Sequence, residues 1–148
     1  MAIDAACRRV AYMNLLIVDD EYYSVEGIRQ KLLASGMEPG NIHAAYSAEQ
    51  ARAVFSEHKV DILLTDIEMP KQNGLELLHW VRNERYSTVV IIITSHANFD
   101  YASRALRLQS IEYLLKPVEG PQLLEAVSRA AEQVRENERK EQQRIDAE

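Results

Sequence analysis

The sequence has few of the residues that mark several large classes of protein. Cys7 is its single cysteine, so the chain forms no internal disulfide and offers no cysteine pair to a zinc ion. The longest apolar run, at 89–93, is far shorter than the ~20 residues of a membrane-spanning helix. A net charge of −6 argues against a chain that coats nucleic acid by itself, because that role requires a basic face.

Motifs of several enzyme classes are missing as well. The chain contains no G-x-G-x-x-G, which argues against a dinucleotide site, and no G-x-x-x-x-G-K-[ST], which argues against a P-loop nucleotide hydrolase. It also lacks the G-x-S-x-G turn of the α/β hydrolases. Its four histidines are scattered and do not pair at metal-ligand spacing. The start of the chain lacks the basic-then-apolar order of a signal peptide, so we expect a cytoplasmic protein.

What the chain does contain is typical of one globular domain. It has 148 residues, of which 47% are apolar and 27% charged. Residues 1–13 show no clear period and are interpreted as a leader. Residues 14–135 are predicted to form the domain. Residues 136–148 have mixed charge and no apolar stripe, so they are either a linker or a solvated extension of the last helix.

Strands and helices are predicted to alternate five times along this domain. The expected strands are 14–18, 41–46, 61–65, 89–94 and 112–115. A helical pattern of apolar residues follows each strand, and we expect Ser24 to cap the first helix and Ser47 the second. This alternation predicts a parallel sheet with helices on both faces. Residues 89–94 are nearly all β-branched and do not alternate with polar residues, so they should form a central strand buried on both faces.

Polar and charged residues stand where four of these strands end. They are Asp19 and Asp20 after the first strand, Asp66 after the third, Thr94 at the end of the fourth and Lys116 after the fifth. Parallel strands bring their carboxyl ends to one edge of the sheet, where ligands bind. We therefore expect acids, a hydroxyl and a cation to converge around Asp66, in a site for a metal ion and a phosphoryl group.

A divalent cation would let these carboxylates share a small volume. Like charges that lie close together repel one another and raise a pKa unless a cation offsets them. Mg²⁺ takes oxygen ligands and is commonly held by one or two carboxylates together with phosphate oxygens. Each group also has an ordinary alternative. The aspartates could simply cap helices, Thr94 could be present because threonine is common in strands, and Lys116 could be an ordinary surface charge. We also predict a cis bond before Pro117, because that turn would aim Lys116 at the strand ends.

Taken in order, these motifs resemble a known family. They are Asp19-Asp20-Glu21, Asp66-Ile67-Glu68-Met69-Pro70 with Gly74, Ile93-Thr94 and Lys116-Pro117. Their order and spacing, from about Leu15 to Val134, resemble the receiver domain of bacterial two-component response regulators. Two further stretches, Phe99-Asp100-Tyr101-Ala102 and Tyr113-Leu114-Leu115-Lys116-Pro117-Val118, resemble receivers joined to AraC-type helix-turn-helix output domains.

The resemblance implies a fold and a chemistry. The implied fold is a flavodoxin-like, doubly wound, five-stranded parallel sheet of order 2-1-3-4-5 with five helices. Asp66 would accept a phosphoryl group from a sensor histidine kinase in a Mg²⁺-dependent reaction. The domain would thus carry self-phosphorylation and autodephosphorylation chemistry without being an enzyme. The implied metal ligands are Asp20, Asp66 and the backbone carbonyl of Glu68, with Asp19 acting through water.

The resemblance also implies a switch. Lys116 would pair with the phosphoryl oxygens and Thr94 would donate a hydrogen bond to one of them. As Thr94 moves toward the phosphate, Tyr113 would turn inward. The added charge of the phosphoryl group would thereby shift the output surface from one of its two conformations to the other. The output face would comprise helix 99–108, strand 112–115 and the helix that starts at Pro121, and a homodimer would form through it.

Control of transcription would require a DNA-binding domain. Only about ten residues follow the last predicted helix, whereas a domain needs roughly 50 or more. We therefore expect a receiver excised from a longer regulator, with a stand-alone receiver as the alternative. The chain departs from the family pattern at Gln109-Ser110, where glycine is usual, and at Ser95, where alanine or glycine is common.

Two residues are predicted to set how long the phosphate lasts. Glu68 and His96 follow Asp66 and Thr94 by two positions each, so both flank the path of the water that hydrolyses the phosphorylated aspartate. Two other classes of protein stay open at this point. One is a Mg²⁺-dependent phosphohydrolase with an aspartate nucleophile. The other is a module of receiver shape that only binds partners.

Overall fold

A five-stranded parallel sheet forms the centre of the molecule. The computed structural model describes residues 12–69, 73–95, 99–109 and 112–147. Its strands are β1 Leu15–Val18, β2 Ile42–Ala45, β3 Ile62–Thr65, β4 Val89–Thr94 and β5 Glu112–Leu115. Their order is β2-β1-β3-β4-β5, and every neighbouring pair is parallel. The predicted sheet and its strand order are confirmed.

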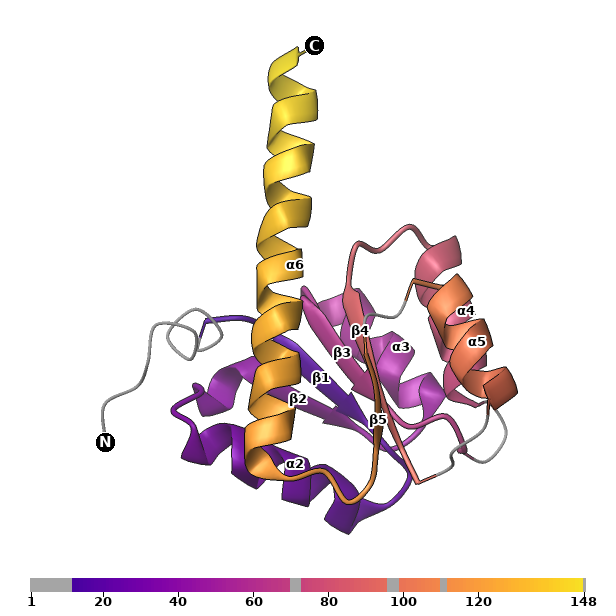
Figure 1. The fold of residues 1–148 in the computed structure, drawn as a ribbon. Helices are drawn as coiled ribbons and strands as arrows, with labels where there is room; N and C mark the ends of the chain where they lie inside the picture. Colours follow the sequence, from indigo (N-terminus) through magenta and orange to yellow (C-terminus); the bar gives the residue numbers. More distant parts are fainter. Residues whose placement is uncertain (1–11, 70–72, 96–98, 110–111, 148) are drawn as a thin grey trace.

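Helices cover both faces of the sheet (Figure 1). They are α2 Tyr22–Ala34, α3 Ala48–Glu57, α4 Gly74–Asn83, α5 Phe99–Arg107 and α6 Gly120–Ala147, with a short 3-10 turn η1 at Pro39–Asn41. The helices α2 and α6 lie on one face, and α3, α4 and α5 lie on the other. This is the doubly wound arrangement that alternating strands and helices predict.

The core has two layers because side chains alternate across each strand. In β1 and β4, Ile17 and Ile91 face the layer under α2 and α6, whereas Val18 and Ile92 face the layer under α3, α4 and α5. All six residues of β4 are buried. The prediction of a central strand buried on both faces is therefore confirmed.

The predicted N-cap residue is correct for α3 and wrong for α2. Gln50 N donates a hydrogen bond to Ser47 Oγ at 3.1 Å, so Ser47 caps α3 as predicted. The predicted cap at Ser24 is wrong, because α2 begins at Tyr22 and its N-cap residue is Glu21. The chain turns from β1 into α2 within three residues, and the Glu21 carbonyl accepts from Ser24 N and Val25 N. Ser24 therefore lies inside the helix.

The C-terminal ends of α4 and α5 are joined through one arginine. Arg82 donates hydrogen bonds to the carbonyl oxygens of Leu108 at 2.9 Å and Gln109 at 3.2 Å, and to those of Thr88 at 2.8 Å and Tyr86 at 3.3 Å. Gln109 has a φ of 65°, a conformation that glycine adopts most easily. Gln109 thus adopts this conformation where the family pattern has glycine, and Arg82 binds its carbonyl.

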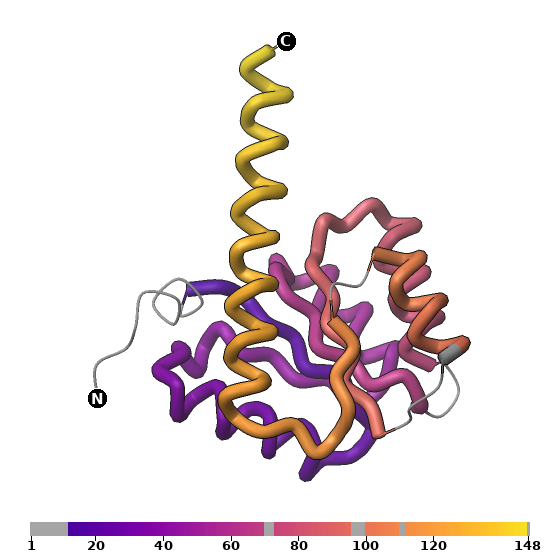
Figure 2. The backbone as a smooth tube through the Cα atoms, in the orientation of Figure 1, coloured from indigo at the N-terminus to yellow at the C-terminus, as the bar shows by residue number. Residues whose placement is uncertain are grey.

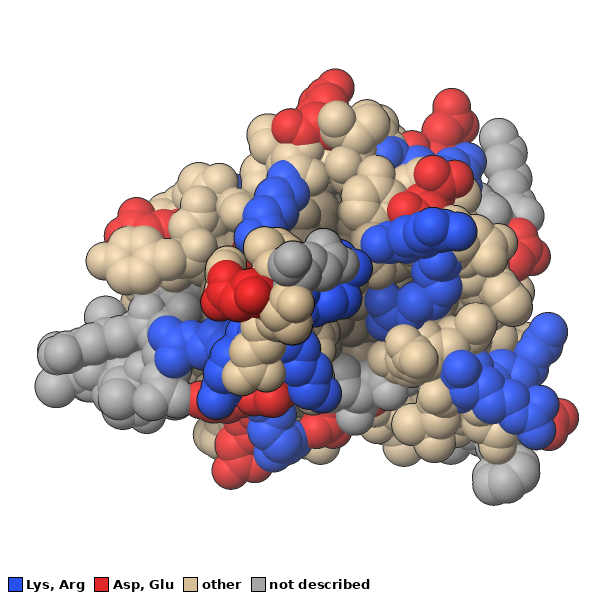
Figure 3. Space-filling view, turned by 90° about the horizontal axis from the view of Figure 1, so that it is seen from above, with Lys and Arg blue, Asp and Glu red and all other residues tan. Residues whose placement is uncertain are grey.

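The last helix continues beyond the body of the domain. Its buried residues end at Val134, and residues 135–147 project from the sheet as one helix (Figure 2). Seen from the side where α6 projects, Lys and Arg side chains are interspersed with Asp and Glu (Figure 3). The pairs Glu136–Arg139 and Glu141–Arg144 link successive turns. Within the described ranges, no helix combines the length and apolar character that crossing a membrane requires.

Candidate functional site

Three carboxylates converge at the carboxyl edge of the sheet. Asp19 and Asp20 follow β1, and Asp66 follows β3. The two strands are neighbours, with Val18 paired to Thr65, so they deliver these acids side by side. Each acid offers an oxygen atom to a cluster in which all three oxygens lie within 4.8 Å of one another. Asp19 and Asp66 are 2% and 7% exposed, whereas Asp20 is open to solvent.

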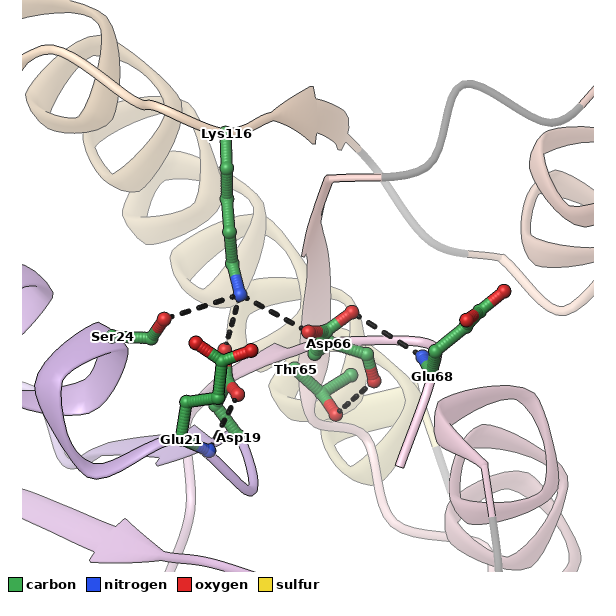
Figure 4. Close-up of polar contacts among 7 residues, drawn as sticks. All are labelled: Asp19, Glu21, Ser24, Thr65, Asp66, Glu68 and Lys116. Carbon is green, nitrogen blue, oxygen red and sulfur yellow. Dashed lines mark hydrogen bonds and ion pairs between the residues drawn. The ribbon is translucent and has the colours of Figure 1, made fainter. Parts of the chain in front are cut away.

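A lysine that follows the edge strand β5 reaches this cluster at the same end of the sheet (Figure 4). Lys116 Nζ contacts Asp19 Oδ2, and it lies 3.0 Å from Asp66 Oδ2 and 3.4 Å from Ser24 Oγ. Its backbone N–H donates to the Thr94 carbonyl at 2.8 Å, which fixes the root of the side chain beside β4. The Lys116–Pro117 bond is cis, as predicted.

Burial and charge act against each other in this cluster. Burial raises the pKa of the Asp19 carboxyl above its ordinary value, and the contacts with Lys116 offset only part of that rise. Burial alone would lower the pKa of Lys116, but the contacts with Asp19 and Asp66 outweigh burial and raise it. The ammonium therefore stays protonated at neutral pH and offsets part of the repulsion between the two buried acids.

The backbone around Asp66 is also held. Asp66 N donates to the Val18 carbonyl at 2.9 Å, which extends the β1–β3 ladder by one bond. Asp66 Oδ1 accepts from Glu68 N at 3.3 Å. The Glu68 side chain is exposed and points away from Asp66 (Figure 4). The peptide backbone of Glu68 is therefore the part of this residue that lies against the carboxylate.

The remaining site residues from the sequence take separate positions. Thr94 is fully buried at the carboxyl end of β4. Tyr113, in the middle of β5, is half-buried and packs with Tyr101 against the layer under α5. His96 lies outside the described residues.

Three contacts at the site do not follow from the sequence motifs. They are the approach of Ser24 to Lys116, the hydrogen bond from Thr65 Oγ1 to the Asp66 carbonyl and the close packing of Gly74 on Asp66. Ser24 could have been found from its position one helical turn after Asp20. Thr65 is a polar residue at the end of an otherwise apolar strand, and that is the only signal it gives.

The donor set fits Mg²⁺. Asp19, Asp20 and Asp66 supply carboxylate oxygens only, the ligands that this hard cation prefers. The bridging position of the Lys116 ammonium between Asp19 and Asp66 is direct evidence that these two acids accept a positive charge between them. Asp20, exposed at the rim, is open to a cation that arrives from solvent.

Fold and site together define the class of the protein. A doubly wound sheet that ends in a lysine-bridged acid cluster is the architecture of a regulatory receiver domain. The family model of the response regulator receiver domain matches residues 15–128. The chain belongs to the response regulator receiver domain family, and it is regulatory in kind, unlike a classical enzyme.

Characterised relatives and solved structures agree with this family. The chain is 31% identical over 110 residues to the transcriptional regulatory protein HptR of Staphylococcus aureus (strain NCTC 8325 / PS 47), an alignment that covers 74% of this chain and 43% of that protein. The chain thus spans less than half the length of this relative.

Two solved receiver structures are close in fold. One is a CheY-like receiver domain protein from Methanospirillum hungatei JF-1, with a TM-score of 0.77 at 26% identity over 84% of this chain and 98% of that one. The other is a receiver domain protein from Clostridium thermocellum, with a TM-score of 0.73 at 30% identity over 81% and 94%.

Proposed function

We propose that Asp66 is the phosphoacceptor of this receiver domain and that a sensor histidine kinase is its phosphodonor. The observation that carries the proposal is the cluster itself, in which a nearly buried Asp66 lies against Asp19 and Asp20 and 3.0 Å from the Lys116 ammonium. A carboxylate in that position is a fixed nucleophile with a cation beside it. Membership of the receiver family supports the same role.

The transfer is a substitution at phosphorus. A carboxylate oxygen of Asp66 attacks the phosphorus of a phosphorylated histidine. The phosphorus–nitrogen bond breaks, its electron pair returns to the imidazole, and Asp66 becomes an acyl phosphate. Lys116 pairs with the phosphoryl oxygens, and the Thr94 hydroxyl donates a hydrogen bond to one of them.

Mg²⁺ is the proposed cofactor. Asp20, Asp66 and the Glu68 carbonyl would hold it directly and Asp19 through water, and when bound it would neutralise charge on the phosphoryl oxygens. Asp19 and Asp66 also keep Lys116 aimed at the site, because its ammonium contacts both carboxylates.

The output of the switch is proposed at a second face. We propose that the full-length protein controls transcription through an AraC-type DNA-binding domain, which the resemblance in residues 99–102 and 113–118 supports. The face formed by α5, β5 and α6 would transmit the signal and form a homodimer. Leu106 and Leu115 on this face are 60% and 45% exposed, so apolar surface is available there for a partner.

Intact mass spectrometry tests the phosphoacceptor proposal. The protein is incubated with Mg²⁺ and acetyl phosphate, and both the protein mass and the released inorganic phosphate are followed. One stable phosphoryl adduct per chain is the expected result. Continuous phosphate release at many turnovers per chain without accumulation of the adduct would instead assign a phosphohydrolase, and an unchanged mass without phosphate release would assign a module that only binds partners. Sedimentation of the full-length protein with and without acetyl phosphate tests the dimer.

A further inference from the structure

The backbone carbonyl of Asp66 is held by the residue that precedes it. Thr65 Oγ1 donates a hydrogen bond to the Asp66 carbonyl at 3.0 Å. Thr65 is 1% exposed, so water does not compete for this bond, and the carbonyl would lose a partner without the hydroxyl. The Asp66 N–H is bound to Val18 in the neighbouring strand. Both peptide groups of the acid are therefore fixed.

A glycine packs against the same carbonyl. Gly74 is the first residue of α4, and a Cβ atom added there would overlap the Asp66 carbonyl oxygen and approach Ile67 Cα. Gly74 N also donates to the Ile67 carbonyl at 2.7 Å. The start of α4 thus lies directly on the peptide unit between residues 66 and 67. Asn73, whose side chain accepts from Glu76 N at 2.9 Å, caps the helix at that point.

This peptide unit lies between the two groups that the proposed chemistry needs. On one side is the Asp66 carboxylate, and on the other the chain runs on to the Glu68 carbonyl. A rotation of the peptide plane re-aims both. Reactions that require an in-line approach lose rate steeply when the nucleophile shifts, about 100-fold for a displacement of about 1 Å.

We propose that Thr65 and Gly74 are positioning residues for the Asp66 nucleophile. The Thr65 hydroxyl and the bare Cα of Gly74 clamp the Asp66 carbonyl and so fix the direction of its carboxylate. This inference rests on the proposed phosphoacceptor role of Asp66. Phosphorylation would then depend on two residues that contact neither the phosphoryl group nor the side chains of the metal ligands.

Three threonine variants separate positioning from packing. Thr65→Val removes the hydroxyl but keeps the shape, and Thr65→Ser keeps the hydroxyl. Thr88→Val is the matched control, because Thr88 is also buried and its hydroxyl donates to the Val60 carbonyl at 2.8 Å in the β3–β4 region away from the acids. With Mg²⁺ and acetyl phosphate, Thr65→Val is expected to lower the saturating rate of phosphoryl uptake roughly tenfold. Thr65→Ser and Thr88→Val should stay within about twofold of wild type.

Gly74→Ala tests the second contact of the clamp and is used if Thr65→Val does not fold. Gly120→Ala is its control, because Gly120 is likewise the first residue of a helix and has open space around an added Cβ. Gly74→Ala should slow phosphoryl uptake at least as much as Thr65→Val, with cooperative unfolding retained. The acetyl phosphate concentration at half-maximal rate should change little, because the clamp acts on the nucleophile.

The outcomes distinguish this inference from the proposed function. If wild type takes up one phosphoryl group and folded Thr65→Val or Gly74→Ala takes it up within twofold of wild type, the clamp is overturned while the function stands. Slowing in Thr65→Ser and Thr88→Val equal to that in Thr65→Val would also overturn it, because packing would then explain the loss. No uptake by wild type would overturn the proposed function and the clamp with it.

Discussion

Lys116 Nζ lies 3.0 Å from Asp66 Oδ2, although 50 residues separate them in the chain. The two residues follow β5 and β3, and β4 lies between those strands. The lysine side chain therefore reaches over the carboxyl end of β4, close to the point where Thr94 ends it. Two buried acids at this distance repel each other. The positive charge of the Lys116 ammonium offsets that repulsion and so stabilises the cluster.

The first prediction concerns metal binding. Mg²⁺ is expected to raise the free energy of unfolding, by about 2.7 kcal/mol when its concentration is 100 times the dissociation constant. Asp20→Ala should remove most of this gain, because Asp20 is the exposed acid of the cluster. Thermal unfolding across a Mg²⁺ titration measures it, with the exposed Glu57→Ala as the control. Equal shifts in Asp20→Ala and wild type would place the metal elsewhere.

The second prediction concerns the lifetime of the phosphate. Glu68→Ala, His96→Ala and the double variant are expected to change the autodephosphorylation rate by more than twofold. The reason is the expectation from the sequence that both residues stand beside the path of water to Asp66, where a glutamate would either repel hydroxide or orient water. The decay of purified phosphoprotein measures the rate. If all three variants decay within twofold of wild type, about 0.4 kcal/mol of barrier, these residues do not tune the reaction.

The third prediction is a pH dependence at β2. The half-buried His43 stacks on His58 with ring centroids 4.3 Å apart, and burial, then His58 and Arg29, lower its pKa below the ordinary value. The unfolded chain therefore binds the proton first as the pH falls. Stability from this group is present above the unfolded pKa of about 6.5 and is lost as the pH falls through the folded pKa.

Urea unfolding at pH 7.5 and at about pH 5.5, a range that spans the ordinary histidine value, measures this effect. His43→Gln should lose less stability than wild type between the two values, and comparison within each pH cancels the contributions of other groups. His79→Gln, which changes an exposed histidine on α4, is the control and should follow wild type. An identical loss in His43→Gln and wild type would contradict the assignment.

The sequence predicts the fold well for a physical reason. Residues such as Val18, Ile92 and Leu115 lie in apolar or β-branched strands whose length and spacing leave few alternatives, and the structure has those strands in the predicted order. Element starts are harder, because they depend on local hydrogen bonds. Ser24 has the composition of a cap, but the helix begins two residues earlier, where the Glu21 carbonyl accepts the first bonds.

The site is predictable only in its charged part. Acids and lysines at strand ends are visible in a sequence, and Asp19, Asp20, Asp66 and Lys116 meet in the structure. The contacts that position these side chains cannot be predicted from the sequence, because they involve backbone atoms. The bond from Thr65 to the Asp66 carbonyl depends on a rotamer, which the sequence does not encode by itself.

The fourth prediction concerns Arg82. Arg82→Lys is expected to lower the free energy of unfolding by about 2 kcal/mol, because one ammonium cannot reach the four carbonyl oxygens that the planar guanidinium serves. Urea unfolding measures the change, with the exposed Arg104→Lys as the control. Amide hydrogen exchange should also become faster at Leu108 and Gln109. Exchange and stability equal to wild type would show that Arg82 does not hold the end of α5.

Asp66→Asn tests the central claim most directly. After incubation with Mg²⁺ and acetyl phosphate, wild type and the control Asp146→Asn should gain the mass of one phosphoryl group, located on Asp66 after proteolysis. Asp66→Asn should gain none, and its unfolding should stay cooperative with stability equal to or above wild type, because the exchange is isosteric and removes one charge from a repelling cluster. An Asp66→Asn protein that takes up one phosphoryl group as wild type does would contradict the account.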